Sequence, residues 1–474
     1  MKWSRVIKIM LATLVVGSIV VEPSAEIYAD KQSSKTPLIY AGNGFSGVVN
    51  SDGSVWSWGN NGGRNTQKTR GGFLGRGETP LQENPFPGLA SLVTVKPVQI
   101  SAGSDATYAL SPEGEILAWG YNKDGLLGTG NSIGIVPSPV RISSDQSLTN
   151  VIYVDGGPYH AAAVRKDGTV WSWGSNTYGR VGTGKTSGYE TYATQVKVLS
   201  GTGYLTNITS VSAGWKHTVA VAADGTIWAW GDNEYGMLGV SGTTSRSYPV
   251  HLGATFNQVK AVSTGLEFTV ALKSDGTVWS WGRNKLGQLG DGTLQDHSTP
   301  MKVKGPGGQG FLDQIVAIKS GINHTLALRA DGTVWSWGDN SDGSLGIGSN
   351  INSNIPVQVQ FKAESGQFIK IKSIEAGDYH NIAISTDKQL FTWGHNFNGG
   401  LGVGDTKLRT APVKVDWQDS IAVSESGYTT SYNYDDNGRL LRKTISRKDG
   451  TASTTYQYTY DNNGNLKHAQ IIQP

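Results

Sequence analysis

The chain has 474 residues and contains no cysteine. Disulfides, thiolate metal ligands and cysteine nucleophiles are therefore excluded together. Charge of one sign is scarce too, because 40 basic and 37 acidic residues leave a net charge of only +3. Proteins that act mainly on nucleic acid are far more basic, so we expect no nucleic-acid partner. Apolar runs are short as well, and none approaches the roughly 20 residues of a membrane-spanning helix, so we expect no membrane partner.

Glycine and tryptophan, in contrast, are abundant, with 64 and 15 copies. Glycine at this level, with only 16% charged residues, favours many short strands and turns over long helices. Disordered chains are poor in aromatic residues, so the tryptophan content indicates a folded protein. The composition predicts an all-β fold.

The first 29 residues have the layout of a secretory signal peptide. Three basic residues occur within the first eight, and residues 9–21 are apolar or small throughout. This run is too short to cross a bilayer, and cleavage is expected after Ala29. An uncleaved amphipathic anchor is the alternative. We therefore expect a secreted protein, either extracellular or associated with the cell surface.

A unit that ends in Trp-Gly recurs seven times along the chain. Successive copies lie 51 to 61 residues apart. That period is too long for most helical repeats and suits the four-stranded blades of a propeller. The seven tryptophans are Trp58, Trp119, Trp173, Trp230, Trp281, Trp337 and Trp393.

The fourth unit shows how each copy is built. A first strand ends near Ala213, and a second covers residues 217–221. Asp224-Gly225 supplies the positive φ angles of a tight hairpin turn before a third strand at 226–230. An outer strand follows at Pro249-Val250, where proline is tolerated. No crossover helix fits between these strands, so they must be antiparallel.

Twelve of the 15 tryptophans occupy two positions on one face of the third strand of each unit. Such an aromatic stripe could form a ligand cage, but burial between neighbouring blades explains it better. Each buried ring then contributes about 2–3 kcal/mol through its area. We predict that the stripe is core.

The repeated unit has a pattern in two parts. It reads Ala-Gly-x-x-His-Thr-x-Ala, then Asp-Gly-Thr-Val-Trp-Ser-Trp-Gly-x-Asn-x-x-Gly-x-Leu-Gly. This pattern resembles the regulator of chromosome condensation repeat family. The resemblance covers about residues 37–415 and implies a seven-bladed β-propeller. The founding member of the family acts on a nuclear small GTPase, which an exported protein would not meet. Unit one lacks a Pro-Val strand before Ile39, whereas unit seven has a surplus one at 412–415. We predict that this surplus strand completes blade one and closes the ring.

Strand alternation also predicts where the irregular loops lie. In an antiparallel meander, the loops after Ala-Gly and after Trp-Gly share one face, and the Asp-Gly turns lie on the other. The seven units differ most on the first face, where aromatic anchors lie beside scattered acids, as in protein-binding hot spots. Loops also vary simply because they are free to. The predicted partner-binding residues are Trp215, Tyr159, Tyr178, Tyr235, Tyr379, Asp232, Tyr121 and Phe397.

Four histidines occupy one position of the unit, which phenylalanine or alanine fills in other copies. Such replacements show that the position does not require a metal ligand. We predict structural, hydrogen-bonded histidines rather than a metal-binding ring, and we expect no cofactor and no catalytic residues. The four are His160, His217, His324 and His380.

From residue 427 to 474 the composition shifts towards tyrosine, threonine and asparagine. Two copies of a Tyr-rich strand followed by Asn-Gly, at Asn437 and Asn463, predict two β-hairpins. The pattern resembles the tyrosine-aspartate repeats of bacterial Rhs-type and teneurin-like surface proteins. Two hairpins alone are marginally stable, so we expect them to pack on the propeller or on a partner.

Taken together, these patterns predict a secreted, monomeric, non-catalytic propeller that binds a protein on one face. The same repeat class includes a secreted bacterial propeller that inhibits β-lactamases, so the resemblance implies inhibition of an extracellular or periplasmic enzyme. A cell-wall or glycan-binding surface protein is the alternative. An enzyme is a third hypothesis, whose acid pair would come from Asp105, Asp232, Glu267, Asp339 or Asp378.

Overall fold

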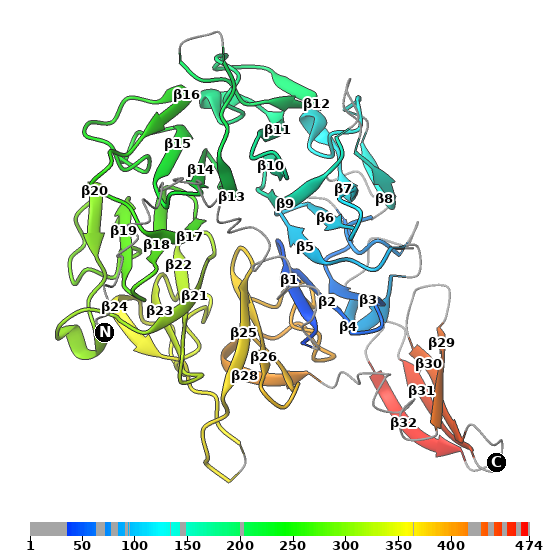
Figure 1. The fold of residues 1–474 in the computed structure, drawn as a ribbon. Coiled ribbons are helices and arrows are strands. Elements are labelled where there is room, and N and C mark those ends of the chain that lie inside the picture. Colours follow the sequence, from blue (N-terminus) through cyan, green and yellow to red (C-terminus); the bar gives the residue numbers. More distant parts are fainter. Residues whose placement is uncertain are drawn as a thin grey trace, which may run out of the picture.

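Seven four-stranded antiparallel sheets stand around a central axis, and an eighth sheet follows them in the chain (Figure 1). The computed structural model describes residues 36–415, apart from 63–71, 77–83, 91–92, 94, 133, 143–147, 200–202 and 364, together with four strands between 428 and 472. The prediction of an all-β, seven-bladed propeller is confirmed. The predicted signal peptide lies outside the described residues. None of the helices in the described segments is long and apolar enough to span a membrane.

Each blade is a simple meander from the axis to the rim. Blade one consists of β1 (Leu38–Ala41), β2 (Phe45–Val49), β3 (Val55–Gly59) and β4 (Asn84–Leu89). Blade two consists of β5 (Gln99–Ala102), β6 (Ala106–Leu110), β7 (Ile116–Tyr121) and β8 (Ile135–Arg141). Blade three consists of β9 (Val151–Gly156), β10 (His160–Arg165), β11 (Val170–Ser175) and β12 (Tyr189–Gln195). Blade four consists of β13 (Ile208–Ala213), β14 (His217–Ala222), β15 (Ile227–Gly231) and β16 (Arg246–His251). Blade five consists of β17 (Val259–Thr264), β18 (Phe268–Lys273), β19 (Val278–Gly282) and β20 (His297–Lys302). Blade six consists of β21 (Ile315–Ser320), β22 (His324–Arg329), β23 (Val334–Gly338) and β24 (Ser353–Gln358). Blade seven consists of β25 (Ile371–Ala376), β26 (His380–Ser385), β27 (Leu390–Gly394) and β28 (Arg409–Val415).

The Asp-Gly turns form as the sequence predicts. In blade four, Gly225 has a φ of 77°, a left-handed value that glycine adopts without steric cost. The Asp224 carboxylate accepts hydrogen bonds from the backbone N–H of Thr226 (3.0 Å) and from its hydroxyl (2.7 Å). This side chain therefore fixes the hairpin that joins β14 to β15.

The predicted strand exchange between the ends of the ring is wrong. Residues 412–415 belong to β28, which pairs with β27 inside blade seven, with Leu390 opposite Val415. Blade one has its own outer strand, β4, which pairs with β3 and places Asn84 opposite Gly59. The two prolines of β4 make it look like a loop in the sequence, but an outer edge strand tolerates proline because one side of it has no partner strand.

The ring closes instead through side chains between blades seven and one, which lie next to each other in Figure 1. Trp58 is fully buried in this interface, where Ile382 and Ile384 belong to the same core cluster. The Trp58 indole N–H donates to the carbonyl oxygen of Gly400 (2.9 Å). The Ser46 hydroxyl donates to the same carbonyl (2.8 Å) and lies 2.7 Å from Nε2 of His380.

This arrangement recurs between consecutive blades, which explains why no exchanged strand is needed. At the interface of blades four and five, the Met237 carbonyl oxygen accepts from the Trp281 indole and from the Thr269 hydroxyl, both at 2.9 Å. Nε2 of His217 lies 2.8 Å from that hydroxyl. The histidine pairs with the equivalent side chain of the next blade in two further interfaces, His160 with Thr218 (2.6 Å) and His324 with Asn381 (2.8 Å).

Burial of the tryptophan stripe depends on the position in the strand. All seven tryptophans of the Trp-Gly pairs are fully buried, as predicted. The first position of the stripe is different, because Trp56 and Trp171 are buried whereas Trp228, Trp279 and Trp335 are only partly buried. The prediction therefore holds only in part for these three rings, which pack against the core clusters but keep some exposed surface.

The C-terminal segment forms one antiparallel sheet of β29 (Tyr428–Tyr434), β30 (Leu440–Arg447), β31 (Ser453–Tyr460) and β32 (Leu466–Ile472). The two predicted hairpins are its halves. Tyr434 faces Leu440 after a register shift, and Tyr460 faces Leu466 after the equivalent shift. The sequence repeat is thus a structural repeat, and its two copies pair with each other through β30 and β31.

Candidate functional site

The loops after the first and third strands gather on one face of the propeller, which we call the loop face. Contacts between blades show this directly, because Tyr159 of the β9–β10 loop touches Trp215 of the β13–β14 loop. Lys216 of that loop in turn reaches Tyr178, which lies in η2 (Thr177–Gly179) between β11 and β12. Both kinds of irregular loop therefore meet on the same side, as strand alternation predicts.

Five of the eight predicted partner-binding residues belong to blades three and four. Trp215 packs edge-on against the Tyr159 ring, with centroids 5.6 Å apart. The Arg180 guanidinium lies 5.1 Å from the centre of the Tyr159 ring and donates to the Trp215 carbonyl oxygen. Tyr159 and Tyr178 each keep 42% of their surface exposed, whereas Trp215 is half-buried.

A chain of charges holds these rings in place. The Lys216 ammonium lies 5.8 Å from the centre of the Tyr178 ring and 2.6 Å from a Glu267 carboxylate oxygen. The other Glu267 oxygen accepts from Arg283, whose guanidinium lies 4.8 Å from the centre of the Tyr235 ring. We call the rings and charges of blades three to five the aromatic-cation patch; its members are Tyr159, Tyr178, Arg180, Trp215, Lys216, Tyr235, Glu267 and Arg283.

The ionisation of the patch favours binding over proton transfer. Burial by itself raises the pKa of Glu267, but the hydrogen bonds from Lys216 and Arg283 outweigh it, so the pKa lies below its usual value. Burial lowers the pKa of Arg180 to about 10, which still leaves it charged at neutral pH. Glu267 is thus a fixed anion between two cations, which is unsuited to the role of general acid.

Asp232 supports the patch from below. Only 3% of it is exposed, and its Oδ1 accepts hydrogen bonds from the Ser245 hydroxyl (3.1 Å) and the Glu234 N–H (3.2 Å). Its Oδ2 lies 3.7 Å from the Lys216 ammonium. A partner on the loop face would therefore sense Asp232 through the position of Lys216.

The remaining predicted residues lie elsewhere on the ring. In blade seven, His395 lies between Tyr379 and Phe397, with ring centroids 5.9 and 4.4 Å away. Phe397 is 61% exposed, which makes it the most exposed of the eight predicted residues. Tyr121 ends β7 in blade two and packs against the core cluster shared with blade one.

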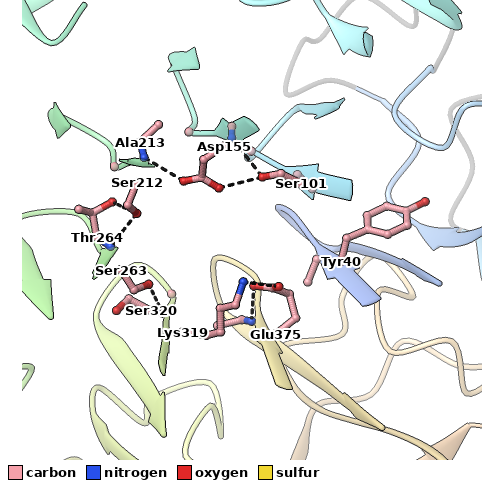
Figure 2. Close-up of a pocket in the computed structure, with 18 of the residues that line it drawn as sticks. Tyr40, Ser101, Asp155, Ser212, Ala213, Ser263, Thr264, Lys319, Ser320 and Glu375 are labelled. Atoms are coloured by element: carbon pink, nitrogen blue, oxygen red, sulfur yellow. Dashed lines mark hydrogen bonds and ion pairs between the residues drawn. The ribbon is translucent and has the colours of Figure 1, made fainter. Parts of the chain in front are cut away.

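The central channel is a second polar feature, with a cavity of about 280 Å³ lined by the innermost strands (Figure 2). Asp155 of β9 accepts from the Ser101 hydroxyl of blade two and from the Ala213 N–H of blade four, both at 2.9 Å. Lys319 of β21 forms an ion pair with Glu375 of β25 at 2.7 Å. Figure 2 shows these groups around the channel, where they link adjacent blades.

Burial raises the pKa of Asp155 to about 6, although the hydrogen bonds from Ala213 and Ser101 act in the opposite direction. Burial lowers the pKa of Lys319, but the adjacent Glu375 outweighs this effect and the pKa is raised overall. The channel therefore carries one fixed ion pair and one carboxyl group that titrates near neutral pH.

The buried histidines do not assemble a metal site. Within the described segments, no group of three or more histidine, aspartate and glutamate side chains is arranged to hold a metal ion. Burial lowers the pKa of His217 and of His380 to about 3, so both rings are neutral at pH 7. Each of the four rings lies within hydrogen-bond distance of a side chain in the next blade, and the predicted hydrogen bonding is therefore confirmed.

The predicted partner-binding residues included none of the three patch cations, Lys216, Arg283 and Arg180, and a signal in the sequence was available for Arg180. Its position, just before the Leu-Gly or Val-Gly pair of the unit, holds an uncharged residue in the five units that follow the same spacing: Leu126, Met237, Gln288, Ser344 and Gly400. A single charge at a position that is otherwise uncharged was the signal available. Its carbonyl oxygen accepts from Trp230 and Thr218, while its guanidinium reaches the loop face.

Comparisons with known proteins agree with this architecture. The family described as RCC1-like domain matches residues 15–314. The regulator of chromosome condensation (RCC1) repeat matches residues 331–384, and a second form of that repeat matches 315–344 and 371–399.

Among curated proteins, the ultraviolet-B receptor UVR8 of Arabidopsis thaliana is 33% identical over 80% of this chain and 81% of its own length. The human E3 ubiquitin-protein ligase HERC2 is 30% identical over 76% of this chain, which spans only 7% of the ligase. Among solved structures, the chain is similar to Prp20p of Saccharomyces cerevisiae, which is described with its binding to Gsp1p and histones. The TM-score is 0.65 and the sequence identity 20%, and the match covers 85% of this chain and 90% of Prp20p. That last likeness concerns the fold alone.

Proposed function

The chain belongs to the RCC1-like family of repeat propellers, and from that premise we propose that it is a non-catalytic protein that binds another protein through the aromatic-cation patch. The observation that carries the proposal is the combination of exposure and rigidity in this patch. Tyr159 and Tyr178 are 42% exposed, yet cations fixed by hydrogen bonds or ion pairs lie beside both rings. Rings that are ordered before binding lose little entropy when a partner arrives.

The backbone turn at Tyr178 supports the same residues, and blade two has an equivalent left-handed turn at Asp124. Tyr178 has a φ of 64°, a left-handed conformation that costs a bulky residue about 1–2 kcal/mol. Strain of this kind is maintained where the surrounding structure holds it and clusters at binding sites. Here it presents the Tyr178 ring above Lys216, at the boundary of blades three and four.

We propose further that the protein is secreted and that its partner is an extracellular or periplasmic enzyme, which it inhibits. The amino-terminal pattern supports export, and the resemblance to a β-lactamase-inhibiting propeller of this repeat class makes β-lactamases the first enzymes to test. The light-receptor and ligase activities in the relatives' names are not part of the proposal. In the second case the chain spans only a small part of the ligase.

Affinity capture tests the proposal. The full chain, immobilised on beads, is incubated with the culture medium of the producing organism, and bound proteins are identified by mass spectrometry. The double variant Trp215→Ala/Tyr235→Ala removes two rings of the patch, and we expect it to capture at least tenfold less partner. Phe368→Ala is the matched control, because Phe368 is 53% exposed and lies between β24 and β25, on the face opposite the loop face.

Equal capture by the double variant would remove the loop face from the proposal. If the captured protein is an enzyme and its activity is unchanged when it is saturated with this chain, the proposal of protein binding stands and the proposal of inhibition is rejected.

The second candidate function is binding to cell-wall glycan. The observation that favours it is a row of lysines and aromatic rings on the rim of blade five, which is separate from the patch.

A further inference from the structure

Three lysines and three aromatic rings alternate along the outer part of blade five, and we call this row the lysine-aromatic ladder. Every neighbouring pair is in cation–π contact, so the ladder is continuous. The successive ammonium-to-ring distances are 4.9 Å (Lys273 to Phe256), 5.5 Å (Lys273 to Trp279), 5.7 Å (Lys302 to Trp279), 5.0 Å (Lys302 to Phe311) and 5.5 Å (Lys304 to Phe311).

The neighbouring blade shows that this charge is not a requirement of the fold. Lys273 ends β18, and the equivalent residue of blade six is Arg329, as strand pairing shows. Arg329 is neutralised by Asp313 (3.0 Å) and Asp331 (4.0 Å). Blade five has Asn257 in place of Asp313, so that source of compensation is missing.

A second substitution adds to the difference. Trp279 faces Lys302 across the β19–β20 pair, whereas the equivalent Trp335 faces the neutral Gln358 in blade six. Both blades keep a lysine bridged to an aromatic residue after the outer strand, Lys304 to Phe311 and Lys362 to Phe368. The bridge is therefore shared by the two blades, whereas Lys302 and the loss of the Asp313 partner distinguish blade five from blade six.

Acidic groups near the ladder leave it positively charged. The pKa of Asp275 is lowered mainly by hydrogen bonds from Thr277, and to a smaller degree by the charges of Lys273 and Lys302. In the described part of the chain, none of the three ladder lysines has a carboxylate within ion-pair distance. Asp291 and His297 also line the pocket described below, where they lie 3.0 Å apart.

A pocket of about 730 Å³ adjoins the ladder between blades five and six, which is the size of a small-molecule site. Trp279, Met301, Phe311 and Ile355 give it a mainly apolar wall, and Lys302 and Lys304 supply the cations. Thr293 also lines the pocket, and its hydroxyl donates to the Asp291 carboxylate at 2.9 Å. Apolar ring faces beside cations suit a ligand that has flat, weakly polar surfaces and carries negative charge.

We propose that the lysine-aromatic ladder and its pocket bind an acidic polysaccharide, whose carboxylates pair with the lysines and whose sugar rings lie against the aromatic wall. A strand of nucleic acid is less well suited, because three cations can neutralise only a few phosphates of such a dense polyanion. The site lies on the rim and does not depend on the loop face, so its success or failure is independent of the proposed protein partner.

The test measures binding of a galacturonic acid trimer to the full chain by titration calorimetry at low salt, with the neutral galactose trimer as the comparison ligand. We expect the acidic trimer to bind and the neutral one to bind at least tenfold more weakly. The variant Lys302→Gln/Lys304→Gln removes two ion pairs and should weaken binding about tenfold. Lys372→Gln, an exposed lysine of blade seven outside the ladder, should change it less than twofold.

Equal binding of the two trimers would overturn the proposal, as would unchanged binding by the double lysine variant. Tighter binding of single-stranded DNA or of an acidic peptide than of the acidic trimer would reassign the ladder to that polyanion and reject the polysaccharide. Circular dichroism melts of each variant test whether loss of fold causes the weaker binding. We expect unchanged melts, because Lys302 and Lys304 are partly exposed and Lys372 is exposed. Added salt should weaken the wild-type interaction, because exposed charges are screened.

Discussion

The blade interfaces and the loop face follow opposite rules although they adjoin in every repeat. Trp215 and Lys216 belong to the aromatic-cation patch, and the next two residues, His217 and Thr218, belong to blade interfaces. The tryptophan indole donates to a carbonyl of the previous blade at all seven interfaces, and at four of them a hydroxyl or amide side chain donates to the same carbonyl. The loop-face groups differ from blade to blade.

The difference teaches where stability and specificity reside. An interface must match a neighbour of the same design, so similar chemistry serves each junction, including the one between blades seven and one. A loop has no such neighbour to match, so it can carry an arginine or a strained tyrosine in one blade only. Substitutions in the two regions should therefore have different consequences.

The largest expected effect is that of Trp337→Ala at the interface of blades five and six. Trp337 is fully buried and donates to the Gln288 carbonyl oxygen at 2.9 Å. Its removal leaves a large cavity and a buried carbonyl without its donor, so we expect the free energy of unfolding to fall by about 3–5 kcal/mol. Urea denaturation followed by tryptophan fluorescence measures this change.

The matched control is Trp215→Ala, the same substitution in the loop face. Trp215 is only half-buried, so we expect a loss of about 1 kcal/mol. Similar losses for the two variants would break the distinction between interface and loop face.

A smaller effect should depend on pH. An unfolded histidine takes up a proton below a pKa of about 6.5, but burial lowers the pKa of His217 in the folded chain to about 3. The unfolded state therefore binds more protons as pH falls from 6.5 towards 3, and stability is lost by up to about 1.4 kcal/mol per pH unit for this ring.

His217→Phe should remove that contribution, because buried phenylalanines occupy the same position in blades one and five. We compare the free energy of unfolding of the variant with that of wild type at each pH. Between pH 7 and pH 5 this difference should shift by about 2 kcal/mol in favour of the variant. Urea titrations at a series of pH values measure this, and parallel pH profiles for the two proteins would contradict the assignment.

A modest effect on stability should accompany the largest effect on binding. Trp215→Ala/Tyr235→Ala removes partly exposed rings of the patch, so the free energy of unfolding should fall by less than about 2 kcal/mol while partner capture is lost. Differential scanning calorimetry and bead capture on the same preparations compare the two quantities. A collapse of stability together with capture would place these rings in the framework instead.

Much of the fold was accessible from the sequence because its signals are local. Seven Trp-Gly pairs, Asp-Gly turns and the spacing between them were enough to predict the blades and the face on which the loops gather. Ring closure was predicted wrongly. The proline-rich β4 was hidden in the sequence, and the surplus strand at 412–415 suggested an exchange that the pairing of β28 with β27 contradicts.

The candidate site was accessible only in part. The sequence placed Tyr159, Trp215 and Tyr178 on one face, but it could not bring them together, since contacts across 50 residues depend on how blades stack. The same limit applies to the ladder, in which residues of β18, β19, β20 and the loops after β16 and β20 meet.

The sequence by itself determined the repeating unit, because hydrogen-bonded turns and alternating strands are properties of neighbouring residues. Only the tertiary structure decided which side chains of different blades become partners, how the ring closes, and which tryptophans are completely buried. Those outcomes depend on distances between segments that are remote in the chain, and packing of whole blades fixes these distances.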